Sequence, residues 1–236
     1  MRSVEQSDGI ELRSSWNLQM NPVYLLSWVV FTALYRVYFG RRVYNADRVP
    51  SAGPVILASN HASFLDPMLV GSGVKRGINY LARENLFRFP VLRWVLHQWQ
   101  VVPVDREGGG AKGLKAILDR LLSGGAIVLF PEGTRSSDGR LQPARSGIGL
   151  TVIKSQAPVV PVRVFGTYEA FNRHSRFPRP RRVAVKFGQP LSFESLRVEA
   201  RTCSKLRLKA IYQQVADELM VAIAKLQPYE DKSQFP

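Results

Sequence analysis

Short apolar runs alternate with helical stretches along most of this chain, and this alternation constrains the fold more than any other feature. The runs that we expect to form strands are residues 55–59, 79–82, 101–104, 126–130, 159–165 and 183–187. We expect helices at residues 67–71, 90–98, 111–122 and 199–226. Strands interleaved with helices predict an α/β fold with a largely parallel sheet flanked by helices. The prolines at positions 158 and 161 favour an edge strand or a shaped wall of the site, instead of a central strand, for residues 159–165.

The first apolar run is followed by the sequence NHASFLD, which places His61 and Asp66 five positions apart. Histidine side chains ordinarily have a pKa of ~6.5 and can accept a proton from a hydroxyl at neutral pH, and a carboxylate on the other ring nitrogen fixes the tautomer. Five positions on one helix rotate a side chain by roughly 500°, so the pair cannot share a helical face. We therefore expect Asp66 to cap a helix that starts at Pro67, with His61 folding back from the preceding loop. The alternative is that Asp66 only caps its helix and His61 is an ordinary loop residue.

A second polar loop, with the sequence FPEGTRS, follows the apolar run over 126–130. Ligands of open α/β sheets bind at the carboxyl ends of the strands, so this loop is expected beside the first one. Gly133 permits close backbone approach, Thr134 offers a hydroxyl, and Arg135 offers the planar fork that suits a phosphate. Glu132 belongs to the same candidate substrate site, or it holds Arg135 in a structural ion pair.

A third apolar run, residues 101–104, ends in the sequence DREGGG. Arg106 is thereby expected near the same rim of the sheet, as a second candidate for binding a phosphate. The alternative is an ordinary solvated arginine beside glycines.

Taken in order, NHxxxxD, the run that ends in Arg106, FPEGTRS and the valine-proline block resemble the sequence blocks of the glycerolipid acyltransferase superfamily, and most resemble those of 1-acylglycerol-3-phosphate acyltransferases. The resemblance covers roughly residues 43–189. It implies that His61 deprotonates the acceptor hydroxyl with the help of Asp66. It also implies a set of residues that bind the glycerophosphate acceptor: Arg106, Glu132, Gly133 and Arg135.

This resemblance implies transfer of a fatty acyl group from acyl-CoA or acyl carrier protein to the free sn-2 hydroxyl of 1-acylglycerol 3-phosphate, which forms phosphatidic acid. The alternative within the superfamily is another acceptor: another lysophospholipid, an aminoacyl lipid or glycerol 3-phosphate. Two departures concern the acceptor. The second block lacks a glycine and phenylalanine before its arginine, and Arg145 only loosely matches a basic residue downstream of the third block. The chain has no GxSxG nucleophile elbow, which leaves Ser63 as the only candidate for a nucleophile.

Residues 22–39 form an almost continuous apolar and aromatic run. As a helix the run would extend ~27 Å, close to the ~30 Å hydrocarbon core of a bilayer. It can be an interfacial or half-inserted anchor, a membrane span, or an ordinary packed helix. Arg41 and Arg42 follow it, which predicts a membrane-associated protein with its catalytic domain on the cytoplasmic side. We therefore divide the chain into a membrane-associating segment, residues 1–40, and an α/β acyltransferase domain, residues 41–236.

The chain is strongly basic, with 33 Lys and Arg against 18 Asp and Glu and a net charge of +15. Such a surplus attracts nucleic acid, anionic lipid or acidic carriers. Without a recognition module we expect no nucleic acid, and we expect a lysophospholipid acceptor, acyl-CoA or acyl carrier protein, and a membrane surface as partners. A non-catalytic membrane-anchored scaffold is the alternative. One Cys and three His in no close cluster predict neither a metal nor a bound cofactor. The basic stretch 173–186 is either a contact for lipid head groups or a solvated loop.

Overall fold

The protein, described from a computed structural model, is defined over residues 21–104 and 111–229. A central sheet has the strand order β1-β8-β7-β2-β6-β3, and all its neighbouring strands are parallel except the antiparallel pair β7 and β8. The strands of this sheet are β1 (Arg42–Tyr44), β2 (Val55–Ser59), β3 (Ile78–Asn79), β6 (Ala126–Leu129), β7 (Val159–Phe165) and β8 (Ala184–Phe187). The prediction of an α/β fold with a largely parallel sheet is confirmed.

A second, two-stranded parallel sheet pairs β4 (Leu81–Arg83) with β5 (Val102–Val104). The predicted strand over 79–82 is therefore divided between the two sheets. The helices are α1 (Pro22–Val37), α2 (Asp66–Ser72), α3 (Pro90–Gln98), α4 (Ala111–Leu122), α5 (Ser146–Ser155), α6 (Thr167–Phe171), α7 (Glu194–Glu199) and α8 (Lys205–Lys225), with short 3-10 helices η1 (Ala46–Arg48) and η2 (Glu84–Arg88). Of these, α5, α6 and α7 have no predicted counterpart, because their sequences are short or rich in glycine.

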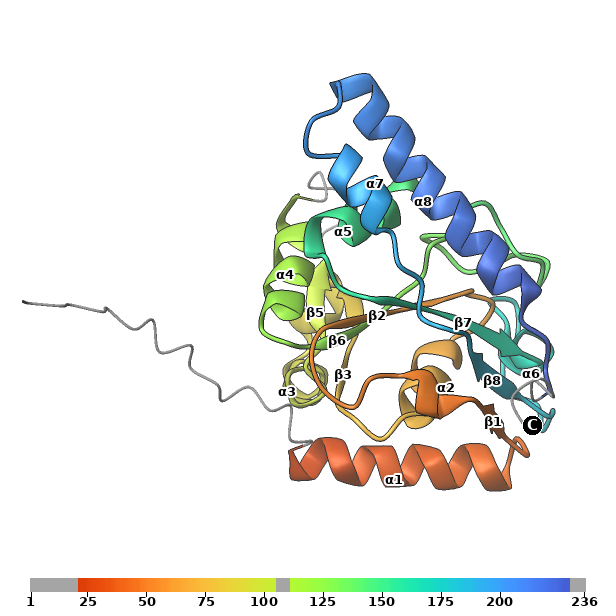
Figure 1. The fold of residues 1–236 in the computed structure, drawn as a ribbon. Coiled ribbons are helices and arrows are strands. Elements are labelled where there is room, and N and C mark those ends of the chain that lie inside the picture. Colours follow the sequence, from red (N-terminus) through yellow and green to blue (C-terminus); the bar gives the residue numbers. More distant parts are fainter. Residues whose placement is uncertain (1–20, 105–110, 230–236) are drawn as a thin grey trace, which may run out of the picture.

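Helices cover both faces of the central sheet, with α1 and α2 on one side and α5, α7 and α8 on the other (Figure 1). The alternation of side chains along β2 divides the core accordingly. Leu57 packs in the cluster that includes Tyr24 and Tyr35 of α1, whereas Ile56 packs in the cluster that includes Ile211 of α8. Each apolar strand is buried on both faces, as expected of a parallel sheet.

The strand β7 lies inside the sheet, between β2 and β8, so the prediction of an edge strand is wrong. A proline is tolerated there because the pairing between β7 and β8 begins only at Val162. Pro161 lies between that ladder and the isolated bridge of Val159 with Leu191, and its carbonyl accepts a hydrogen bond from the Gly188 N–H at 2.7 Å.

Helix α1 is packed against the domain along one side. Asn21 caps it by accepting a hydrogen bond from the Tyr24 N–H at 2.8 Å, and the Tyr24 hydroxyl accepts one from the Ile78 N–H at 3.0 Å. The Trp28 indole donates to the Val74 carbonyl at 3.0 Å, and Tyr35 is buried. The other side of α1 exposes the aliphatic residues Leu25, Leu26, Val29, Val30, Leu34 and Val37. Among the described residues, no helix combines the length and apolar character that crossing a membrane requires.

Helices α5 and α8 pack closely against each other. A Cβ atom added at Gly149 of α5 would lie 1.8 Å from the backbone oxygen of Tyr212 in α8. A Cβ at Gly147, also in α5, would meet no atom within 4 Å. Glycine at position 149 is therefore required by packing, and glycine at position 147 is not.

We predict that Gly149→Ala lowers the free energy of unfolding by about 2 kcal/mol or more, because α5 and α8 must separate to admit the methyl group. Gly147→Ala is the matched control, and its better helix propensity should leave stability unchanged or raise it by up to about 1 kcal/mol. Thermal unfolding of both variants checks this. Equal stability of the two variants would contradict the packing described for these helices.

Candidate active site

The loop that follows β2 is hydrogen-bonded to β7 and to the loop that follows β6. The Asn60 side chain accepts a hydrogen bond from the Val164 N–H of β7 at 2.8 Å. The backbone of His61 is held on both sides, because its N–H donates to Glu132 Oε1 at 2.9 Å and its carbonyl accepts from the Ser136 N–H at 2.7 Å. The two polar loops predicted to share a rim of the sheet therefore lie side by side.

His61 and Asp66 are brought together, with 2.9 Å between His61 Nδ1 and Asp66 Oδ2. Asp66 is fully buried, and its Oδ2 also accepts hydrogen bonds from the Ala62 N–H at 2.6 Å and the Ser63 N–H at 2.7 Å. The expectation that Asp66 caps the helix starting at Pro67 is wrong. Asp66 is itself the first residue of α2, and its carboxylate points back into the loop, where two backbone N–H groups converge.

This geometry assigns the two ring nitrogens of His61 different tasks. A carboxylate next to Nδ1 favours the tautomer in which Nδ1 carries the proton, which leaves Nε2 able to accept one. The ring stacks on Phe130 at a centroid distance of 3.9 Å, and 17% of the His61 side chain is exposed. The imidazole is thus fixed in orientation and still reachable by a small reactant.

Ser63 does not offer a nucleophile to this site. It is fully buried, and its hydroxyl donates to the Phe171 carbonyl at 2.5 Å and accepts from the Leu65 N–H at 3.0 Å. The hydroxyl is occupied in shaping the loop. This leaves the His61 imidazole as the reactive group of the loop.

Glu132 lies beneath the loop. It is 3% exposed, its Oε1 accepts the His61 N–H, and its Oε2 is buried without a hydrogen-bond partner among the described residues. Burial raises the pKa of Glu132 to about 7, and the negative charge of Asp66 raises it further. The hydrogen bonds from the backbones of His61 and Gln142 lower this pKa, but their effect is smaller than that of burial. Glu132 therefore holds the backbone of His61, and in the part of the chain that the structure describes no hydrogen bond joins it to the imidazole, so its effect on the ring is exerted through the loop.

Gly133 and Arg135 of the second loop are half-buried. Gly133 has φ of +70°, and a Cβ there would come within 2.8 Å of Arg145 Cδ, so only glycine fits. The Arg135 guanidinium carbon stands 3.5 Å from the centre of the Phe64 ring, a cation–π contact. Thr134 is exposed. Arg106, the remaining predicted residue, lies outside the described residues.

A cavity of about 650 Å³ extends from His61 between β4, β5, α4 and α5. Its wall is mainly aliphatic and includes Leu81, Val104, Leu114, Ile117, Leu129, Ile148 and Leu150. The volume falls in the range of ~300–1,000 Å³ typical of ligand pockets. Within the described residues no group of His, Cys, Asp and Glu side chains is arranged to hold a metal ion.

Two cationic residues of this cavity were not predicted as site residues. Arg83 ends β4 and Arg145 precedes α5, and both line the cavity. The loose match of Arg145 to a family position was the only available indication, and it did not identify the contact with Gly133. An isolated arginine in a strand, as at position 83, gives no indication at all.

The raised pKa of Glu132 predicts a pH dependence of stability. The folded state holds this proton up to about pH 7, whereas the unfolded chain releases it near 4.5, so folding binds a proton between these values. The contribution of Glu132 is therefore most favourable at low pH and is lost as the pH rises through about 7. Glu132→Gln, which keeps an acceptor for the His61 N–H, should remove this loss.

Urea unfolding of parent and Glu132→Gln between about pH 5 and about pH 8 measures the effect. The stability of the parent relative to the variant should fall across this range, by up to about 3 kcal/mol. Parallel profiles would contradict the assigned environment of this carboxyl group.

The sequence matches the family model described as Acyltransferase over residues 40–165. A chloroplastic 1-acyl-sn-glycerol-3-phosphate acyltransferase of Brassica napus is 32% identical over 133 residues, which cover 55% of this chain and 38% of that protein. The 1-acyl-sn-glycerol-3-phosphate acyltransferase of Bacillus subtilis is 27% identical over 153 residues, 64% of this chain and 74% of that protein. The chain thus spans well under half the length of the Brassica relative.

A solved structure has a similar fold. The 1-acyl-sn-glycerophosphate (LPA) acyltransferase PlsC from Thermotoga maritima aligns with a TM-score of 0.64 and 21% sequence identity, over 86% of this chain and 82% of that chain. The segment that matches the family model makes up more than half of the chain, and it includes both polar loops of the site. The chain therefore belongs to the acyltransferase family.

Proposed function

We propose that the protein transfers a fatty acyl group from an acyl thioester to the free sn-2 hydroxyl of 1-acylglycerol 3-phosphate, which yields phosphatidic acid. The observation that carries this proposal is the His61–Asp66 pair at the mouth of an aliphatic cavity. The names of the Brassica and Bacillus relatives support the acceptor.

In the proposed reaction, His61 Nε2 accepts the proton of the acceptor hydroxyl as its oxygen attacks the thioester carbonyl. The negative charge of Asp66, 2.9 Å from Nδ1, stabilises the imidazolium that forms. Collapse of the tetrahedral intermediate breaks the carbon–sulfur bond, and the thiolate takes the proton back from His61. No acyl-enzyme forms, in keeping with the buried, hydrogen-bonded Ser63 hydroxyl.

We assign the cavity to the fatty acyl group. Its aliphatic wall between α4 and α5 starts at His61, so an acyl chain bound there presents its carbonyl carbon to the imidazole. Removing the chain from water provides binding energy of roughly 25 cal/mol per Å² of apolar surface. Coenzyme A and acyl carrier protein are both acidic donors, and the basic surface suits either of them.

We assign the acceptor phosphate to the cationic rim of the cavity. Arg145 lines the cavity beside Gly133, and Arg135 follows in the same loop with its guanidinium on the Phe64 ring. Guanidinium groups can bind two phosphate oxygens at once. Arg106 is proposed as a further phosphate ligand on the strength of the sequence pattern alone. Glu132 takes part by holding the His61 backbone.

The exposed aliphatic side of α1 supports association with a membrane through an interfacial helix. The arginines of the basic stretch 173–186 are exposed and suit anionic head groups, whereas Lys186 is buried in β8 and hydrogen-bonded to the Tyr229 carbonyl. We retain the proposal that the catalytic domain is on the cytoplasmic side.

The test is an acyltransferase assay of the purified protein with acyl-CoA or acyl carrier protein as donor and a panel of acceptors. We expect lysophosphatidic acid to react faster than glycerol 3-phosphate and faster than lysolipids without a free phosphate monoester. His61→Ala should lower the rate by about 10²- to 10⁴-fold, the usual contribution of general-base catalysis. Its thermal unfolding, compared with the parent, separates lost chemistry from lost folding.

Two outcomes would contradict the proposal. Equal rates with phosphate-free acceptors would show that the arginine rim has another role. A His61→Ala variant that is folded and retains the parent rate would show that the imidazole is not the base.

A further inference from the structure

The segment formed by η2 and α3 exposes an unusual amount of apolar surface. Its exposed side chains, with exposed fractions, are Leu86 39%, Phe89 64%, Val91 79%, Leu92 36% and Trp94 54%. In α3 only Leu96 is buried. Concentrated exposure of this kind marks an interaction surface, because scattered apolar residues are normal and clustered ones are unfavourable in water.

The charges of the same segment are mostly positive. Arg88 and Arg93 are exposed, and Glu84 is the one acidic residue between positions 84 and 98. Tryptophan and phenylalanine interleaved with arginine suit the boundary between head groups and acyl chains. Each basic residue near an anionic bilayer contributes ~1 kcal/mol of attraction.

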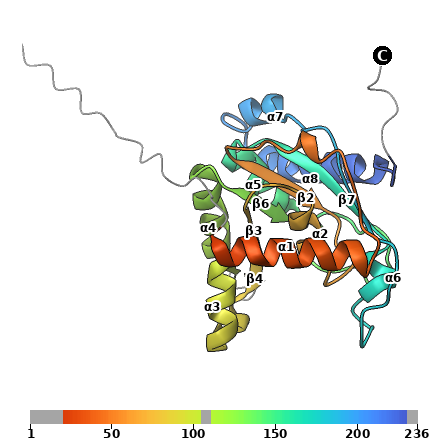
Figure 2. The same ribbon diagram turned by 90° about the horizontal axis from the view of Figure 1, so that it is seen from below.

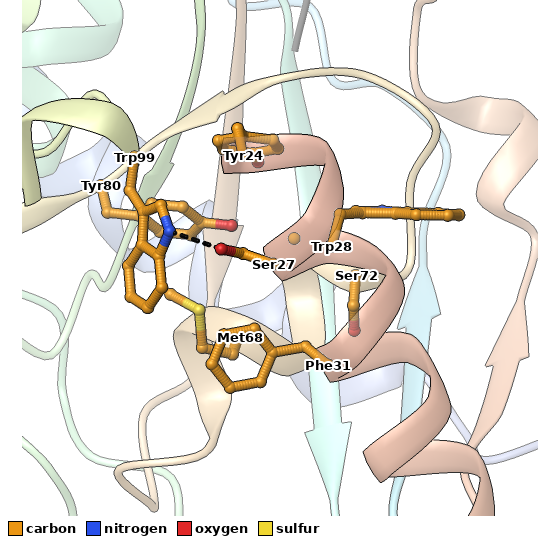
Figure 3. Close-up of a pocket in the computed structure, with 9 residues that line it drawn as sticks. Tyr24, Ser27, Trp28, Phe31, Met68, Ser72, Tyr80 and Trp99 are labelled. Atoms are coloured by element: carbon orange, nitrogen blue, oxygen red, sulfur yellow. Dashed lines mark hydrogen bonds between the residues drawn. The ribbon is translucent and has the colours of Figure 1, made fainter. Parts of the chain in front are cut away.

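The C-terminal end of α3 is fastened to α1. The Asn21 side chain donates to the Gln98 carbonyl at 2.8 Å. The Trp99 indole donates to Ser27 Oγ at 2.9 Å (Figure 3). The rings of Trp99 and Phe31 meet edge to face at 5.7 Å. The gap left between α1, α2 and Trp99 is about 20 Å³, room for roughly one water and no lipid. The two helices therefore belong to one rigid surface.

Seen from below, α1 and α3 both lie on the near side of the molecule and run at a large angle to each other (Figure 2). The outward side of α1 carries Leu26, Val30 and Val37, among the most exposed aliphatic residues of the chain. Contact along two crossed helices fixes the orientation of a protein on a flat surface, whereas contact along one helix leaves it free to roll about that axis.

We propose that η2–α3 is a second membrane-contacting element, which docks with α1 on an anionic lipid surface. The effect of this docking on acyl transfer rests on the proposed function. The segment joins β4 to β5, and both strands line the cavity beside His61. Docking through α3 thus holds the cavity wall against the leaflet that supplies the acceptor and receives the product.

The bilayer is favoured over two other occupants. An acidic acyl carrier protein would complement the arginines and leave Phe89, Val91 and Trp94 without apolar partners. A second copy of this chain would set the arginines of one copy against those of the other. A lipid surface satisfies both the apolar and the cationic side chains.

The experiment is sedimentation with vesicles of mixed phosphatidylglycerol and phosphatidylcholine, using the double variant Phe89→Ser/Trp94→Ser. Its partition coefficient should fall by about tenfold or more, which corresponds to about 1.4 kcal/mol. The matched control is Leu206→Ser/Val221→Ser. These residues are 81% and 53% exposed on α8, across the sheet from α1, and their replacement should leave binding unchanged (Figure 1).

A second readout uses Trp94 directly. Brominated lipids in the vesicles should quench part of the tryptophan fluorescence of the parent, and Trp94→Phe should lose that part. Circular dichroism confirms that the variants are folded. With a short-chain, water-soluble acceptor the double variant should react as fast as the parent, and with acceptor presented in vesicles it should react more slowly.

Unchanged vesicle binding by the double variant would overturn the proposal. Loss of activity only with acyl carrier protein as donor would reassign the surface to the donor. A change in oligomeric state on sedimentation velocity would reassign it to a second copy. Vesicle binding is measured without turnover, so α3-dependent binding by a protein that lacks acyl transfer would leave this inference standing and remove the proposed function.

Discussion

One buried oxygen, Oδ2 of Asp66, organises the loop on which the site depends. It lies 2.9 Å from His61 Nδ1 and accepts the N–H groups of Ala62 and Ser63. A buried carboxylate is costly unless it is hydrogen-bonded or paired, and Oδ1 of the same group has no hydrogen-bond partner among the described residues. The loop therefore closes around Oδ2, and this closure sets the orientation of the imidazole.

The helix that carries Asp66 is held at both ends by the N-terminal part of the chain. The Tyr35 hydroxyl of α1 donates to the Leu65 carbonyl at 2.7 Å, just before α2. Arg41 donates to the carbonyl and the hydroxyl of Ser72, at 2.8 Å each, where α2 ends. Burial raises the pKa of Tyr35 well above its usual value, as does the charge of Asp66, so the hydroxyl remains a donor. The helix proposed to face lipid thus also supports the loop that carries His61.

The sequence predicted the strands and loops of the candidate site better than the contacts between their residues. Apolar runs followed by polar loops predicted strands β2 and β6 and their shared rim, because burial and loop chemistry are local properties. The internal position of β7 depends on where its partner β8 ends, and the role of Glu132 depends on a contact 71 positions away with His61. Likewise, long-range packing brings Arg83 and Arg145 to the lining of one cavity. Such contacts have no local pattern.

The most direct test of this account is a comparison of kcat and KM for Asp66→Asn with those of the parent. Asparagine keeps an oxygen that can accept the Ala62 and Ser63 N–H groups, and it loses the charge that stabilises the imidazolium. We predict a folded protein whose kcat falls by about 10²-fold or more while KM for donor and acceptor changes little. A folded variant with the kcat of the parent would contradict the claim that the Asp66 carboxylate makes His61 a base.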